Sequence, residues 1–186
     1  MKISQIKPSR YLAFCILSLF FVTITVAEPL SSLITVPAKP QSPNFELMDM
    51  DDEIHKLSDY KGKPVIINFW ASWCHECRHE LPSMNRAKEK LKNSGVKMIA
   101  INVGESEETI FKFANKYPIN FLVLRDETAK EAKKWSIIGM PTTFVLDPDG
   151  RIVYQAVGPR QWDNDALLDK IITLKKKSDL SKNDLK

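Results

Sequence analysis

Hydrophobic and polar positions follow two different periods along the chain, and together they predict a mixture of strands and helices. Nearly continuous apolar runs at 64–71 (PVIINFWA) and 96–103 (VKMIAINV) are typical of strands buried on both faces. Between them, apolar side chains recur at spacings of three and four, which predicts a helix from 74 to about 93. The first half of the compact region therefore predicts a strand, a helix and a second strand in succession.

The rest of the chain continues this alternation. The further predicted elements are a hairpin arm over 45–49 and 53–56, a helix over 106–117, a strand over 121–124, a helix over 127–135, strands over 142–146 and 151–157, and a helix capped by Asp163 that ends near Leu174. The turn signal at 147–150 (DPDG) joins the last two strands. This order predicts an α/β fold with a central mixed sheet flanked by helices.

The N-terminus has the pattern of an export segment. Three basic residues precede seventeen uncharged residues at 11–27, and small residues at Thr25 and Ala27 suit cleavage after Ala27. A membrane anchor formed by residues 11–27, with its basic end in the cytoplasm, fits as well. Under either interpretation, we expect the remainder to lie in the periplasm or at the extracytoplasmic face of the inner membrane.

These patterns divide the chain into four parts. We assign 1–27 to the signal or anchor, 28–43 to a proline-rich spacer, 44–175 to one folded domain and 176–186 to a flexible lysine-rich tail. The spacer contains four prolines, which favour an extended chain.

Composition narrows the classes of function. The chain is 44% apolar and 27% charged, which excludes a long disordered chain, a collagen and a polytopic membrane protein. The net charge is +4, and without residues 1–27 it falls to +1, since 24 basic residues then face 23 acidic ones. We therefore expect no nucleic-acid partner, and contact with a membrane only through the N-terminal segment.

Two cysteines, Cys74 and Cys77, lie in the exported part, and they are spaced as C-x-x-C. Positions i and i+3 of a helix share a face, so the two sulfur atoms can reach disulfide distance. The N-terminus of the predicted helix favours a thiolate, which makes Cys74 the expected nucleophile. Cys77, one turn deeper, is then the resolving thiol. The pair predicts redox chemistry.

Two metal-based alternatives use the same segment. Residues 75–79 (HECRH) match H-E-x-x-H, the pattern of zinc metalloproteases, but the third ligand should follow it and His55 is upstream. A copper or other metal carrier using Cys74, Cys77 and one histidine suits soft thiolate ligands. Haem attachment is excluded, because Arg78 stands where C-x-x-C-H requires histidine. We expect no bound metal and no cofactor other than the cysteine pair.

The wider motif resembles a known family. Residues 68–77 (NFWASWCHEC) resemble the thioredoxin active site, Pro82 stands where that superfamily kinks its first helix, and residues 139–144 (GMPTTF) resemble its cis-proline loop. Within the superfamily, the chain is most similar to the exported TlpA/ResA-like reductases. The shared features are the export segment, Asn68, residues 80–82 (ELP), an extra strand and helix through Tyr117, and the hairpin at 147–150. The resemblance spans about 42–175.

This resemblance implies roles for further residues. A cis peptide bond before Pro141 would leave the backbone of Met140 facing outward, where a substrate strand can pair with it. Trp73 is an expected part of the same substrate-binding surface. Cytosolic thioredoxins carry a buried acid at the position of Asn68, so another base must serve Cys77 here. Glu80 is a candidate for that proton transfer, although one turn past Cys77 it can equally be a solvated side chain.

The resemblance also implies a direction of reaction and partners. Such proteins reduce protein disulfides outside the cytoplasm, often those of apocytochrome c before haem attachment, and receive electrons from a membrane thiol carrier. We expect a monomer. Between the cysteines, a protonated His75 would favour an oxidant, whereas Glu76 adds negative charge and opposes it. A thiol oxidase or isomerase of the same fold is the alternative. A peroxiredoxin shares the architecture, but its nucleophile normally lacks a C-x-x-C partner.

Overall fold

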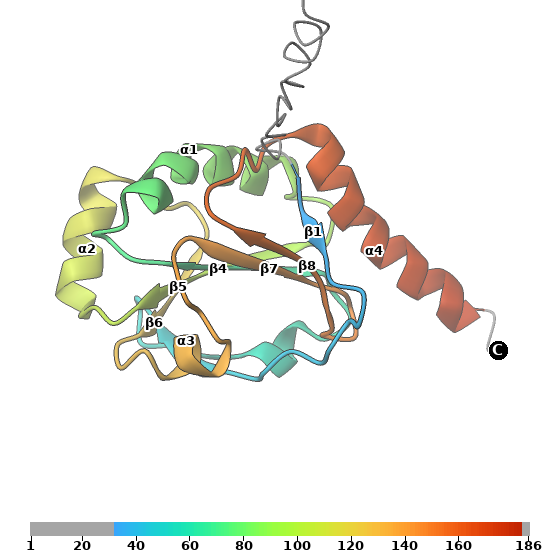
Figure 1. Ribbon diagram of the computed structural model, residues 1–186, viewed down its shortest axis with the longest axis horizontal. Coiled ribbons are helices and arrows are strands. Elements are labelled where there is room, and N and C mark those ends of the chain that lie inside the picture. The colour runs from blue at the N-terminus through green and yellow to red at the C-terminus, as the bar shows by residue number, and fades with distance from the viewer. Residues whose placement is uncertain (1–31, 184–186) are drawn as a thin grey trace, which may run out of the picture.

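The computed structural model describes residues 32–183, which form an eight-stranded mixed sheet with helices on both faces (Figure 1). The strand order is β1-β8-β7-β4-β5-β6-β2-β3. The elements are β1 (Ile34–Thr35), β2 (Glu46–Asp49), β3 (Ile54–Lys56), the 3-10 helix η1 (Leu57–Tyr60), β4 (Val65–Trp70), α1 (His75–Lys90), β5 (Lys97–Val103), α2 (Glu107–Lys116), β6 (Leu122–Asp126), α3 (Lys130–Lys134), β7 (Thr142–Leu146), β8 (Ile152–Val157) and α4 (Asp165–Asn183). The predicted α/β class and mixed sheet are confirmed.

Strand β4 lies in the middle of the sheet, and every one of its residues is buried. It pairs in parallel with β5 and antiparallel with β7, so that Asn68 lies between Ala100 and Thr143. Because successive side chains of a strand point to opposite faces, Ile66 and Trp70 belong to one core, whereas Val65, Ile67 and Phe69 belong to the other. The carboxyl end of β4 leads directly into the cysteine motif.

The two faces of the sheet carry separate cores. Helices α1, α2 and α4 cover one face, where Met84, Phe113 and Ile171 belong to a single apolar cluster. Helix α3 and η1 cover the other face, where Trp135 packs against Phe69 and Phe144. Figure 1 shows this three-layer arrangement, with α1 above the sheet and α3 below it.

The predicted hairpin arm is present as β2 and β3, and it extends the sheet beyond β6. A nearly buried cation, Arg125 of β6, forms ion pairs with Asp52 in the hairpin turn, Glu107 at the start of α2 and Glu127. Removing one partner of such a group leaves buried charge uncompensated, so this contact fixes the arm to the domain.

Of the predicted spacer, residues 32–43 are described, and part of this segment belongs to the sheet. Strand β1 pairs antiparallel with β8, and Gln41 forms a β-bridge with Arg151. Ser42 is buried, and its backbone N–H donates to Gly150. The folded unit therefore begins before residue 44.

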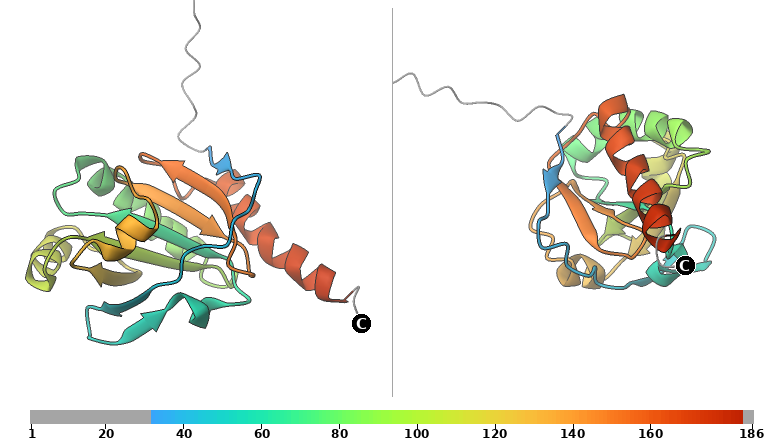
Figure 2. Two further views of the ribbon diagram at one scale, coloured as in Figure 1. Left: turned by 60° about the horizontal axis from the view of Figure 1, so that its bottom comes forward. Right: turned by 90° about the vertical axis from the view of Figure 1, so that its right-hand side faces the viewer.

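The last helix differs from the prediction at both ends. Asn164, rather than Asp163, supplies the capping oxygen, which accepts from the backbone N–H of Leu167 at 3.1 Å, because Asp163 is paired with Arg86. The helix also continues past Leu174 to Asn183, where the sequence predicted a flexible tail. Lysines have high helix propensity, which favours this extension. Figure 2 shows α4 projecting beyond the sheet.

Helix α3 is shorter than the predicted 127–135. Ala129 adopts a left-handed conformation with φ of 55°, which delays the start of the helix. The carboxylate of Asp126 then accepts the first free backbone N–H groups, those of Glu131 and Ala132. The export segment at 1–27 lies outside the described residues. Within residues 32–183, no helix is both long and apolar enough to cross a membrane.

Candidate active site

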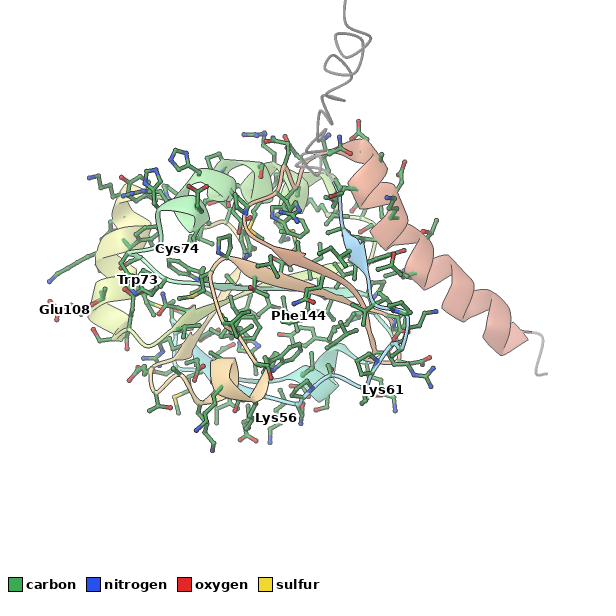
Figure 3. The ribbon with its side chains drawn as sticks, in the orientation of Figure 1. Lys56, Lys61, Trp73, Cys74, Glu108 and Phe144 are labelled. Atoms are coloured by element: carbon green, nitrogen blue, oxygen red, sulfur yellow. A yellow bond between two sulfur atoms is a disulfide. The ribbon has the colours of Figure 1, made fainter. Side chains whose placement is uncertain are left out.

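Cys74 and Cys77 form a disulfide at the point where β4 passes into α1 (Figure 3). Cys74 is the N-cap residue of α1, and its sulfur accepts the backbone N–H of Cys77 at 3.1 Å. The Cα atoms lie 5.3 Å apart, and both side chains are buried. The first turn of the helix thus directs the backbone N–H of Cys77 toward the sulfur of Cys74, and a donor at this position favours a thiolate after reduction.

The loop before the disulfide is fixed by a carboxylate from a different strand end. Glu105 accepts hydrogen bonds from the backbone and the hydroxyl of Ser72, two residues before Cys74, and from the amide of Asn102. Sequence reasoning missed Glu105, because nothing in the local pattern relates it to the cysteine motif. The contact anchors the loop that positions the nucleophile.

Glu80 is buried one turn past Cys77, with a relative exposure of only 3%. Its Oε1 accepts from Asn68 Nδ2 at 2.8 Å, and its Oε2 accepts from Trp162 Nε1 at 2.9 Å and from the backbone N–H of Arg160 at 3.2 Å. The same Asn68 nitrogen also donates to Thr143. The interpretation of Glu80 as a solvated side chain is therefore wrong, because Asn68 of β4 and the loop that carries Arg160 and Trp162 enclose it.

Two effects of the surroundings act on the pKa of Glu80 in opposite directions. Burial raises its pKa from the ordinary 4.5 to about 7, although the three hydrogen bonds from Trp162, Arg160 and Asn68 favour the carboxylate and limit the rise. A carboxyl group with such a pKa can exchange a proton near neutral pH. It lies on the same face of α1 as Cys77, since the two residues are three positions apart.

The loop before β7 faces the same end of the sheet. The peptide bond between Met140 and Pro141 is cis, as the resemblance implied. An open groove of about 530 Å³ runs beside it, lined among others by Trp73, Ile138 and Met140. Trp73 is 70% exposed and Ile138 is 94% exposed. Large apolar side chains with this much exposure are typical of a surface that binds another chain.

The residues between and after the cysteines are exposed. His75 and Glu76 lie in the first turn of α1, and their side chains face solvent rather than the disulfide core. His75 contacts Arg78 through Nδ1 at 3.0 Å and His79 through Nε2 at 2.9 Å. His75 therefore lies in a network with its helical neighbours.

The third histidine lies apart from this network. His55 pairs with Asp49 at 2.8 Å and contacts Tyr60 in the hairpin arm. Within residues 32–183, three or more ligand atoms that could hold one metal come together only at Asp49, Glu53 and His55. The structure thus provides no three-ligand site for the zinc hydrolase alternative at residues 75–79.

The comparisons with known proteins agree with this geometry. The model of the AhpC/TSA family matches residues 39–155, more than half of the chain. The thiol-disulfide oxidoreductase ResA of Bacillus subtilis is 38% identical over 117 residues, which are 63% of this chain and 65% of that protein. ResA of Bacillus thuringiensis subsp. konkukian is 35% identical over 118 residues, 63% of this chain and 68% of that protein. The chain thus spans about two thirds of the length of these relatives.

A solved structure extends the similarity. The crystal structure of a Chlorobium tepidum protein, described as a thiol:disulfide interchange protein DsbE, superposes with a TM-score of 0.68 at 33% identity. The match covers 77% of this chain and 99% of that one. The cysteine pair, the buried Glu80 and the cis-proline loop lie within the matched family region. The chain therefore belongs to the AhpC/TSA family and, within it, to the ResA-like thiol-disulfide oxidoreductases.

Proposed function

We propose that the protein reduces disulfide bonds of other proteins outside the cytoplasm by cycling Cys74 and Cys77 between dithiol and disulfide. The observation that carries this proposal is the disulfide at the N-terminus of α1, with a buried carboxyl group one turn below it. A nucleophile beside free backbone N–H groups and a resolving thiol beside a base are the two parts that thiol–disulfide exchange needs.

The reaction begins from the dithiol form. The Cys74 thiolate attacks one sulfur of the target disulfide, and the other target sulfur leaves and takes up a proton. Cys77 then passes its proton to Glu80 and attacks the sulfur of Cys74. The bond between Cys74 and the target breaks, and the departing target thiolate takes up a proton to become the second thiol. The target gains two electrons and the protein becomes the disulfide. A membrane thiol protein that donates two electrons would restore the dithiol.

The groove beside the cis-proline loop is the proposed binding surface for the target. The backbone of Met140 can pair with an extended segment, and Pro141 holds the loop beside the cysteine pair. Trp73 and Ile138 add exposed apolar area to the lining of the same groove. An unfolded polypeptide with an apolar residue next to its cysteine matches this surface. Apocytochrome c, expected from the family resemblance, is the proposed substrate, and the protein would act on it as a monomer.

The direction of reaction can be tested through the reduction potential. We expect a potential near that of thioredoxin, roughly −270 mV, rather than the roughly −120 mV of strong oxidants. Replacing Glu76 with glutamine removes a negative charge beside the Cys74 thiolate and should raise the potential by about 10–20 mV. Equilibration with glutathione or dithiothreitol measures both. A wild-type potential above about −180 mV would favour an isomerase or oxidase instead.

A Trp73→Ala substitution tests the binding surface. Loss of this exposed ring should raise KM for a protein disulfide by roughly tenfold, because aromatic anchors dominate many protein interfaces. Reduction of a small disulfide, which does not fill the groove, should change little. Ile54→Ala is the matched control, since Ile54 is an exposed apolar residue of the hairpin arm outside the groove lining. Equal losses on both substrates would place Trp73 in the chemical step and contradict the binding role.

A further inference from the structure

Two histidines of α1, His75 and His79, form a pair that takes no part in the proposed proton and sulfur transfers. His75 and His79 are four positions apart, so they lie on one face of the helix, and both are exposed. Their ring centroids are 4.4 Å apart, and the rings meet edge to face at 71°. The Nε2 atoms of the two rings are 2.9 Å apart. This contact is a hydrogen bond between the two Nε2 atoms, and it brings both possible ligand atoms together at the surface.

The separation of the two nitrogens matches that of neighbouring metal ligands. At metal–nitrogen distances of about 2.0–2.1 Å, two nitrogens at 90° lie ~2.9 Å apart, and two at the tetrahedral angle lie ~3.3 Å apart. Right angles are typical of square-planar and tetragonal copper(II) and nickel(II) sites, and imidazole suits both metals. Copper(II) binds more tightly than nickel(II) in the general order of divalent affinities. We propose that His75 and His79 form a surface binding site for copper(II).

The proposed site differs from both metal alternatives considered for the sequence, and from the expectation of no bound metal. Among the described residues, no third cysteine, histidine or carboxylate brings a ligand atom within 4.8 Å of both imidazoles, so water fills the other positions. Such an open, two-ligand site exchanges its metal readily. It also needs no thiolate, and the disulfide form should therefore bind copper(II).

Arg78 opposes the metal in this geometry. Its guanidinium donates to His75 Nδ1 at 3.0 Å, which leaves the imidazole proton of neutral His75 on Nε2, the ligand atom. A metal at Nε2 requires that proton to move to Nδ1, so Arg78 has to turn away. The guanidinium carbon already lies 5.4 Å from the centroid of the Tyr117 ring, and this contact can hold Arg78 once it no longer donates to His75. Removing Arg78 should therefore strengthen copper binding.

Titration of the oxidised full chain with copper(II) tests the site. Calorimetry and electron paramagnetic resonance monitor the binding. We expect one bound equivalent with nitrogen couplings from two imidazoles. His75→Asn and His79→Asn should each weaken it by at least about tenfold, since each removes one of two protein ligands. Arg78→Ala should tighten it. His55→Asn is the matched control, because His55 belongs to the separate cluster with Asp49.

Several results would overturn the proposal. Absence of binding to the oxidised wild type would do so, as would binding that survives both helix substitutions or that is lost with His55→Asn. His79→Asn should also leave reduction of a protein disulfide unchanged in metal-free buffer. Failure of copper binding can thus be told apart from failure of the proposed redox function, which the potential and the disulfide assay measure without metal.

Discussion

Replacing Cys74 with serine should abolish disulfide reduction, whereas replacing Cys77 with serine should leave a protein that attacks its target once and stays joined to it. The reason lies in the first turn of α1, where the sulfur of Cys74 receives the backbone N–H of Cys77. We expect the Cys74→Ser protein to lose activity by a factor on the order of 10³ or more, as for other covalent nucleophiles.

The trapped species provides the measurement. Cys77→Ser should accumulate a mixed disulfide with the target, visible as a mass increase that dithiothreitol reverses. The Cys74→Ser and double variants serve as matched controls and should trap nothing. If the mixed disulfide accumulated in Cys74→Ser instead, Cys77 would be the nucleophile and Cys74 the resolving thiol. Loss of trapping in every variant, with intact folding, would contradict the exchange mechanism.

Much of the fold follows from local patterns, because the central strands carry their signal in their own residues. The run at 64–71 is buried throughout β4, and the recurring apolar positions after it became the buried stripe of α1. Helix ends were harder to place, because capping is decided by competition across elements. Asp163 has the right chemistry for a cap, but Arg86 of α1 holds its carboxylate and Asn164 takes its place.

The candidate site divides in the same way. The cysteine pair was predictable, since both members lie within one helical turn, and so was the cis peptide bond before Pro141, through the family resemblance. The enclosure of Glu80 was not, because Trp162 and Arg160 approach it from about 80 positions away. One signal was available. Position 80 falls on the stripe that also carries Cys77 and Met84, and a polar residue on a buried stripe indicates a function or a network.

An asparagine at position 68 did not by itself mean that the site lacks a buried acid. In the strand it replaces the acid of cytosolic thioredoxins, yet its amide donates to Glu80 and to Thr143. The acidic group of this site thus comes from α1, and Asn68 holds it in place. The contact also explains how an amide at the centre of β4 is satisfied, which a fully buried polar group requires.

Replacing Glu80 with glutamine should slow the step in which Cys77 releases the target. A positioned general base contributes about 10²-fold or more, so we expect decay of the mixed disulfide to slow by about 100-fold at pH 8. In the wild type this rate should rise with pH through about 7, since the ionised carboxylate accepts the proton. The variant should lose that inflection. Stopped-flow measurement of target release between pH 5.5 and 9 provides both profiles.

Stability provides an independent check on the same group. The pKa of Glu80 is raised in the folded state. Its contribution to the free energy of unfolding is therefore fully present below pH 4.5 and is lost as the pH rises through about 7. A change of one in pKa corresponds to about 1.4 kcal/mol. A pKa of about 7 in place of 4.5 thus predicts that the free energy of unfolding falls by roughly 3 kcal/mol. Glutamine cannot ionise, so urea unfolding of Glu80→Gln should lack this loss between pH 5 and 8. If the stability profile flattens while the rate profile keeps its inflection, Glu80 is a buried acid without a role in proton transfer, and another group serves Cys77.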